Sequence, residues 1–318
     1  MSLPAAHAVR RPPDCTYPNT YPNTSPNTSP NAVQTYPTYA RPLVPETGRC
    51  ATIMRMSTVG VTREGHVVVV ELQQGPHNFA SVEVMNDLSD ALEVATGDGA
   101  RAAVICAEGK SFCAGAQFSG ASGTRANNFG SFVQTDEASS IGPFYESAVR
   151  LFNATIPLVA AVHGPAVGAG FGLATACDMR VICAEAFMAT NFVRLGIHPG
   201  FGISLTLPEL IGPARAADVL LTGRRIYGEE AFQLGLANRL VAQSDVRSTA
   251  LAIATEMATG APLAVQSTRA TLRSGLAARV RTQLLHERQT QDRLSGTKDA
   301  EEGISAMLER RDPVFSGK

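Results

Sequence analysis

The sequence predicts an α/β core followed by a helical region. Strand-like apolar runs dominate the first two thirds of the chain, and helical patterns dominate the last third. The stretch Pro157 to Asp178, PLVAAVHGPAVGAGFGLATACD, is typical of a buried strand that leads through a glycine-rich turn into an apolar helix. With 318 residues, 44% of them hydrophobic, the chain can form one large domain or two small ones.

The N-terminal segment has a different composition from the rest. Residues 16–31 repeat YPNT, YPNT, SPNT and SPN, and the segment is poor in Leu, Ile and Val. Such a composition buries too little apolar surface to offset the entropy of ordering, so we expect residues 1–56 to be a disordered low-complexity tail. A transit peptide and an extension upstream of a true start near Met54 or Met56 remain open alternatives.

The folded part is expected to begin at residue 57 with two strands, 59–63 and 66–72, joined by a Glu-Gly turn. A helix with one apolar face, a buried strand, a second glycine turn and another helix follow, over residues 82–95, 102–107, 108–116 and 141–153. Between them, residues 119–140 are rich in Ser, Gly and Asn, which predicts an irregular loop over a site.

The central stretch suggests where chemistry takes place. Gly164, Gly168, Gly170 and Gly172 precede a helix expected over Leu173–Cys177. Unpaired N–H groups at a helix start, with the helix dipole behind them, can hold an anion or a polarised carbonyl. The glycine order differs from the dinucleotide-binding fingerprint, and glycines that serve only close packing are an open alternative.

The elements expected after residue 178 complete the α/β core and form the helical region that follows it. A strand over 179–184 and an irregular segment over 186–200 come next. Helices and one short strand follow, over residues 203–211, 214–222, 229–234, 237–241 (the strand), 246–259, 262–275 and 303–311. We therefore expect an α/β core over 57–245 and a helical oligomerisation region over 246–318.

Composition argues against several classes of partner. The net charge of −1 provides no global basic field for nucleic acid, and no apolar run approaches the roughly 18 residues of a membrane span. No hydrophobic segment of a secretory signal is visible at the N-terminus. The six cysteines form no C-x-x-C pair, and we expect reduced, buried thiols rather than a metal site.

Five stretches resemble the motifs of the crotonase superfamily, the enoyl-CoA hydratase/isomerase family. They are RAAVICAEGKSFCAGAQF (101–118), PLVAAVHGPAVGAGFGLATACDMRV (157–181), LGIHPGFGISLTLPELIG (195–212), LLTGRRIYGEEAFQLGLANRLV (220–241) and EGISAMLERRDPVF (302–315). The resemblance implies a crotonase (ClpP-like) fold, a superhelix of repeated β-β-α turns, with a C-terminal helical trimerisation region. It also implies homotrimers that often pair into hexamers.

The same resemblance implies an acyl-CoA thioester as substrate. Its oxygen would be held by the backbone N–H groups of Ala116 and Ala169, which would stabilise an enolate. No further cofactor is implied, because CoA is part of the substrate. A role in fatty acid metabolism follows, in the cytoplasm of a bacterium or in an organellar matrix.

Five further positions match the CoA-binding parts of the family. The adenine side of CoA is expected along Ala114, Gln117 and Phe118. Phe315 and Lys318 correspond to a C-terminal tail that reaches the CoA of a neighbouring subunit.

The acid/base positions depart from the family pattern. Two glutamates usually serve hydration, and an isomerase subgroup places an acid elsewhere; the matching positions here are Gly172, Phe192 and Gly200. Glycine and phenylalanine cannot transfer protons, so two-glutamate hydration is not expected. The remaining candidates for acid or base are His198, Glu137 and Glu146. The favoured alternatives are a turn histidine at the surface for His198 and solvated acids in or just after the variable loop for the two glutamates.

The sequence therefore predicts an acyl-CoA-processing lyase of the hydratase/isomerase kind that lacks the usual glutamates. An isomerase, an acyl-CoA hydrolase or a C–C lyase of the same fold remains possible, as does a non-catalytic acyl-CoA-binding protein. A protease of the related architecture is disfavoured, because the sequence has no G-x-S-x-G motif.

Overall fold

The computed structural model describes residues 54–117 and 140–318. Its main sheet has seven strands in the order β1-β2-β3-β4-β5-β7-β10. Strands β3, β4, β5, β7 and β10 are parallel, whereas β1 and β2 are antiparallel additions at one edge. The bounds are Met54–Arg55, Val59–Glu64, Val67–Leu72, Ala102–Ala107, Leu158–Val162, Met179–Ile182 and Arg239–Leu240. Burial on both faces explains why β4 and β5 consist almost entirely of apolar residues.

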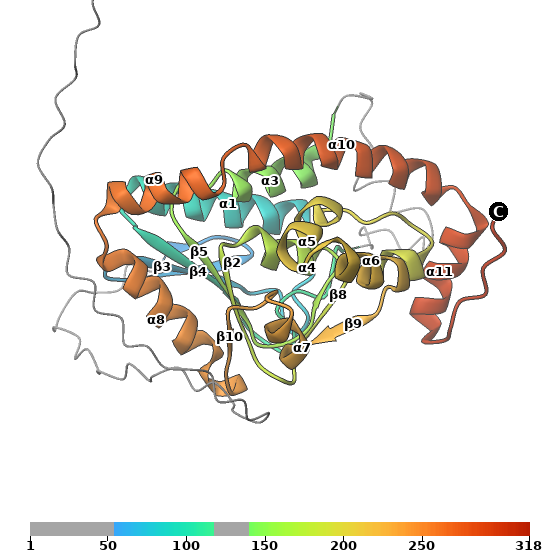
Figure 1. Cartoon of the computed structure of the whole chain (residues 1–318), viewed down its shortest axis with the longest axis horizontal. Helices are drawn as coiled ribbons and strands as arrows, with labels where there is room; N and C mark the ends of the chain where they lie inside the picture. The colour runs from blue at the N-terminus through green and yellow to red at the C-terminus, as the bar shows by residue number, and fades with distance from the viewer. Residues whose placement is uncertain (1–53, 118–139) are drawn as a thin grey trace, which may run out of the picture. The chain divides into compact units, whose positions relative to one another are not determined.

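Helices cover both faces of this sheet (Figure 1). Helices α1 and α3 pack together on one side, with α10 above α3, and α8 packs against β4, β5 and β7 on the other. The hydroxyl of Ser81 caps α1 by accepting from the N–H of Val84 at 3.1 Å. The helices are α1 (Val82–Gly97), α3 (Gly142–Phe152), α4 (Ala169–Ala176), α5 (Ile203–Ile211), α6 (Pro213–Thr222), α7 (Gly228–Gln233), α8 (Val246–Thr259), α9 (Pro262–Leu272), α10 (Leu276–Ser295) and α11 (Lys298–Glu309).

A second sheet corrects one expectation. Strands β6 (Ala166–Val167), β8 (Phe187–Ala189) and β9 (Arg225–Tyr227) pair in that order, and a 3-10 helix follows over Asn191–Leu195. The prediction of an irregular segment over 186–200 was therefore wrong, because strands of two or three residues are too short to show a periodic pattern.

The helix of the central stretch begins earlier than predicted. It starts at Ala169 rather than Leu173, so that Gly170 and Gly172 are helical residues. Helix propensity disfavours glycine, but α4 is fully buried and tertiary packing decides its conformation. The first turn of α4 therefore consists of the glycine-rich segment itself.

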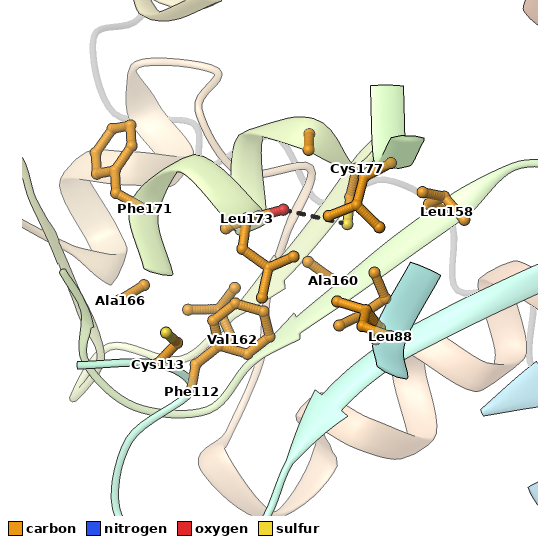
Figure 2. Packing of buried hydrophobic residues seen from close by; sticks show 14 of the residues in the cluster. Leu88, Phe112, Cys113, Leu158, Ala160, Val162, Ala166, Phe171, Leu173 and Cys177 are labelled. Carbon is orange, nitrogen blue, oxygen red and sulfur yellow. Dashed lines mark hydrogen bonds between the residues drawn. The ribbon is translucent and has the colours of Figure 1, made fainter. Parts of the chain in front are cut away.

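The core lies between α4 and the main sheet. The side chains of Leu173, Val162 and Phe112 gather there (Figure 2), and each is fully buried. The thiol of Cys177 in the same cluster donates to the carbonyl of Leu173 at 3.6 Å. The prediction of buried thiols is confirmed for the four described cysteines, which form no disulfide: Cys106, Cys113, Cys177 and Cys183.

Burial also controls the chemistry of these thiols. Desolvation raises the pKa of Cys113 to about 11 and that of Cys177 to about 12. Neither thiol is therefore a reactive thiolate near neutral pH. Within the two described segments, no helix is both long enough and apolar enough to span a bilayer.

Candidate active site

The two glycine-rich turns of the sequence, over residues 108–116 and 164–172, contact each other through backbone atoms. Cys113 of the first turn pairs with Ala166 next to the second, and the N–H of Val167 donates to the carbonyl of Cys113 at 2.9 Å. A Cβ on Gly170 would lie 2.8 Å from the carbonyl carbon of Cys113 and closer still to its oxygen. Only glycine permits this approach, so the sequence pattern encodes the contact between the two turns.

A cavity of about 370 Å³ lies where these turns meet. Residues 114–116 of the first turn and residues 167–169 of the second form part of its wall. Aromatic rings form much of the remainder, from Phe79, Phe144, Phe192 and Phe201. The cavity is therefore a mainly apolar chamber whose backbone-lined side carries both predicted amide donors.

The N–H groups of Ala116 and Ala169 have no hydrogen-bond acceptor among the described residues. For Ala116 the reason is its pairing with Ala80, which uses the carbonyl of Gly115 and the N–H of Gln117 instead. Ala169 is the first residue of α4, where an N–H has no partner within the helix. Two backbone donors are therefore available in the wall of one cavity.

The three positions where the resemblance places acids are occupied differently. Phe192 lines the cavity. A Cβ on Gly172 would lie 2.5 Å from the Cβ of Phe201 and closer still to its ring, and a Cβ on Gly200 would lie 2.7 Å from Nε2 of Gln291. Among the described residues that line the cavity there is no Asp or Glu.

Two polar side chains in the cavity wall were missed by the sequence reasoning. Tyr145 donates its hydroxyl to Oε1 of Gln291 at 2.8 Å, and burial raises the pKa of this phenol, so it stays protonated. His77 places Nδ1 3.2 Å from Oγ of Ser111, and its carbonyl accepts from the N–H of Ala114. The turn Gly-Pro-His-Asn ahead of α1 was the available signal for His77, whereas nothing in its helix marks Tyr145.

The predicted acid/base candidates lie elsewhere. His198 is not in the cavity wall: its ring packs edge-on against His286 at 5.7 Å, and burial lowers its pKa. Glu146 is half-buried and accepts from Arg281 at 2.7 Å. Glu137 lies outside the described residues. The structure brings neither His198 nor Glu146 to the cavity.

The predicted CoA positions are divided between two places. Ala114 lines the cavity, Gln117 is exposed beside it, and Phe118 lies outside the described residues. The C-terminal tail folds back on α11, where the carboxylate of Asp299 accepts from the N–H groups of residues 316 and 317 at 2.7 and 2.8 Å. Phe315 is 42% exposed, and neither it nor Lys318 lines the cavity.

A second cavity, of about 610 Å³, shares four lining residues with the first: Val167, Asn191, Leu195 and Met307. It is lined by four arginines, of which two are paired with carboxylates. The other two, Arg194 and Arg225, have no carboxylate partner in the described part of the chain. Guanidinium groups are suited to bind phosphate or carboxylate, so this adjoining cavity can accept an anionic group.

Comparisons with known proteins identify the family of the chain. The family model described as Enoyl-CoA hydratase/isomerase matches residues 62–318. The chain is 31% identical to 2,3-dehydroadipyl-CoA hydratase of Escherichia coli over 83% of this chain and 100% of that one. It is 30% identical to an enoyl-CoA isomerase/hydratase of Zymoseptoria tritici over 86% of this chain and 90% of that one.

Solved structures give the same result. The crystal structure of an enoyl-CoA hydratase/isomerase from Pseudoalteromonas atlantica superposes with a TM-score of 0.71 at 25% identity, covering 82% of this chain and 100% of that one. One from Mycobacterium paratuberculosis gives a TM-score of 0.68 at 28% identity, covering 79% and 98%. Both the sequence and the architecture thus agree on one assignment: the chain belongs to the enoyl-CoA hydratase/isomerase family of the crotonase superfamily.

Proposed function

We propose that this protein processes an acyl-CoA thioester by stabilising its enolate with two backbone amides. The observation that supports this proposal most directly is that Ala116 and Ala169 line one cavity and that their N–H groups have no acceptor among the described residues. A thioester oxygen that accepts from both gains negative charge as the α-carbon loses a proton. Donors aimed at such developing charge lower the barrier by about 2.7–4 kcal/mol each.

Proton transfer is assigned to a group other than the family glutamates. Among the described side chains in the cavity wall, the imidazole of His77 is the kind of group that most often serves as a general acid or base, whereas Tyr145 is buried and already donates to Gln291. The hydroxyl of Ser111 at 3.2 Å from Nδ1 orients the imidazole. We propose His77 as the first acid/base candidate, ahead of His198 and Glu146.

The arginine-lined cavity extends the proposal to the rest of the substrate. An anionic group of the acyl-CoA, either a CoA phosphate or a carboxylate at the far end of the acyl chain, is proposed to bind between Arg194 and Arg225. The E. coli relative is named for a substrate with such a carboxylate. Comparing free CoA with adipyl-CoA and hexanoyl-CoA in binding to an Arg225→Gln variant separates the two sources.

The C-terminal tail is proposed to serve a second copy of the chain. Phe315 is partly exposed and lies outside the wall of its own cavity, which fits contact with CoA in a neighbouring subunit. A trimer or a dimer of trimers would provide that neighbour. Light scattering on the purified protein tests it: a monomer at assay concentration contradicts this part of the proposal.

A non-catalytic acyl-CoA binder is the second candidate. It is favoured by the absence of Asp and Glu from the described part of the cavity wall. Calorimetry with acyl-CoA, combined with a turnover panel of enoyl-, hydroxyacyl- and ketoacyl-CoA thioesters, separates the two. Binding without turnover of any thioester supports the binder and contradicts the enzyme.

The amide donors are tested by Ala169→Pro, with Ala169→Gly as the matched control. Proline removes the N–H at the first position of a helix, where it is otherwise tolerated, and glycine keeps the N–H. We expect kcat to fall by about 10²–10³-fold in the proline variant and to change little in the glycine variant. Equal activity of both variants at the same folded fraction would contradict a role for this donor.

A further inference from the structure

A buried carboxylate accepts from the residue next to Phe201, which lines the cavity. Glu287 of α10 is fully buried, and its two oxygens accept from the N–H of Gly202 at 2.8 Å and from the N–H and hydroxyl of Ser204 at 3.2 and 2.5 Å. No ion pair of Glu287 is found in the described part of the chain. A single buried carboxylate thus satisfies three donors at the start of α5.

The turn that donates these hydrogen bonds is strained. Phe201 has a φ of +61° and Gly202 a φ of +72°, so both adopt the left-handed conformation. An aromatic residue is rarely found there, and such a conformation persists only when the surroundings hold it in place. The N–H groups of residues 202 and 204 donate to Glu287, so these hydrogen bonds hold the backbone directly after Phe201 in place.

The strained conformation determines where one aromatic ring lies. The Phe201 ring enters the cavity wall, packs edge-to-face with Phe144 at 6.0 Å between centroids, and covers Gly172. If the turn relaxed, the ring would move relative to Gly172, and the shape of the cavity would change.

We infer that Glu287 is a positioning residue that holds the 201–204 turn, so that the Phe201 ring forms the wall that limits the length of the acyl group. This inference rests on the proposed acyl-CoA function for its ligand, but the turn itself can be tested without one. Tyr145 on α3 is the titratable side chain that faces Glu287, and the carboxylate contributes to its raised pKa. Desolvation raises the pKa of Glu287 itself to about 7.

A double-mutant cycle tests the link between Glu287 and Phe201. In the wild type, Gly172→Ala forces its new methyl group into Phe201 and is expected to lower the urea midpoint. In a Glu287→Gln background the side chain keeps one acceptor oxygen instead of two, so one of the two backbone anchors is lost. Phe201 can then yield, and we expect about half the shift or less. Ser204→Ala is a milder second background with the same expected direction.

The control is Glu209→Gln, which removes an exposed carboxylate of α5 bound to Arg279 of α10. This substitution removes an ion pair between α5 and α10, the helices that Glu287 also connects, at a place away from the cavity. In this background Gly172→Ala should lower the midpoint as much as in the wild type. An equal shift in all four backgrounds would overturn the inference, whatever the protein's activity.

Acyl-chain selectivity provides the second readout. Glu287→Gln and Phe201→Ala are both expected to favour longer acyl-CoA thioesters by several-fold in kcat/KM, or in affinity if none is turned over. A purely structural role of Glu287 would lower the folded fraction without changing this ratio, and that result overturns the inference. Failure of the wild type to bind any acyl-CoA contradicts the proposed function instead and leaves the double-mutant cycle as the test of the turn.

Discussion

The Phe201 ring covers the backbone of Gly172, so that a Cβ on residue 172 would lie 2.5 Å from the Cβ of Phe201 and closer still to the ring. The resemblance places a catalytic glutamate of hydratases at residue 172. The packing therefore leaves no room for that side chain. A glutamate could be accommodated only if Phe201 left its position, so the two residues form a matched pair.

The first prediction restores the missing acid. Gly172→Glu alone should destabilise the protein by about 1–3 kcal/mol or more, because the core is overpacked and a carboxylate is buried. The double variant with Phe201→Gly should recover much of this loss, since glycine removes the ring and suits the positive φ at residue 201. Denaturant midpoints of both variants, with Phe201→Gly alone as control, measure the effect. A double variant no more stable than Gly172→Glu would contradict the matched pair.

The second prediction ranks the histidines. His77 lines the cavity, whereas His198 packs against His286 outside its wall. If His77 transfers the proton, His77→Gln should lower kcat by about 10²–10⁴-fold with a smaller change in KM. His198→Gln should lower it less. Exchange of the α-proton of a saturated acyl-CoA in deuterated water, followed by NMR, measures this step directly, and the opposite ranking would point to His198.

The third prediction concerns pH and stability. The pKa of Glu287 is raised to about 7 in the folded protein, so the folded state holds the proton more tightly than the unfolded state. The free energy of unfolding should therefore be greatest below the unfolded pKa, near 4.5, and fall as pH rises toward and through 7. The full loss is on the order of 3 kcal/mol.

Urea titrations between pH 5 and 8 measure this loss in the wild type and in Glu287→Gln. The variant has no proton to release at this position, so its stability should vary less over the same range. A pH dependence that is identical in the two proteins would show that another group causes it.

The fourth prediction concerns a buried ion cluster at the strand end. The carboxylate of Asp178 accepts from the N–H of Leu158 at 2.8 Å, from Nε of Arg269 at 2.8 Å and from Arg273 at 2.9 Å. Asp178→Ala leaves two largely buried guanidinium groups without their carboxylate and should cost about 3–5 kcal/mol. Asp90→Ala, which removes an exposed partner of Arg150, should cost less than about 1 kcal/mol.

Chemical denaturation of the two aspartate variants gives the comparison. A loss of similar size in both would show that the cluster at Asp178 contributes no more than a surface ion pair.

Sequence patterns located the main elements because their signals are strong and local. Strand β4 over 102–107 coincides with its predicted range, and α8 over 246–259 does as well. The short strands β6, β8 and β9 were missed, since pairing with distant segments rather than local periodicity creates them.

The site could be predicted only in part, because some of its residues are brought together by contacts between distant segments. Ala116 and Ala169 could be proposed from the sequence because glycine turns leave a recognisable pattern and backbone donors need no particular side chain. Tyr145 and Glu287 lie on helices in which nothing local marks them, and the one local signal for His77 was the Gly-Pro-His-Asn turn. The positive φ of Phe201 also has no sequence signal, and the carboxylate that accepts from the next residue lies on α10, 85 positions later in the chain.

The backbone contact between the two glycine turns has a consequence for variation in this protein. Gly170 presses on the carbonyl of Cys113, and Gly164 on that of Lys110, so main-chain atoms fix how the turns meet. A library that randomises the aromatic residues around the chamber would therefore alter which ligands fit while leaving the spacing of the turns intact. Under the proposed function, the range of ligands and the geometry of the two amide donors can thus diversify independently.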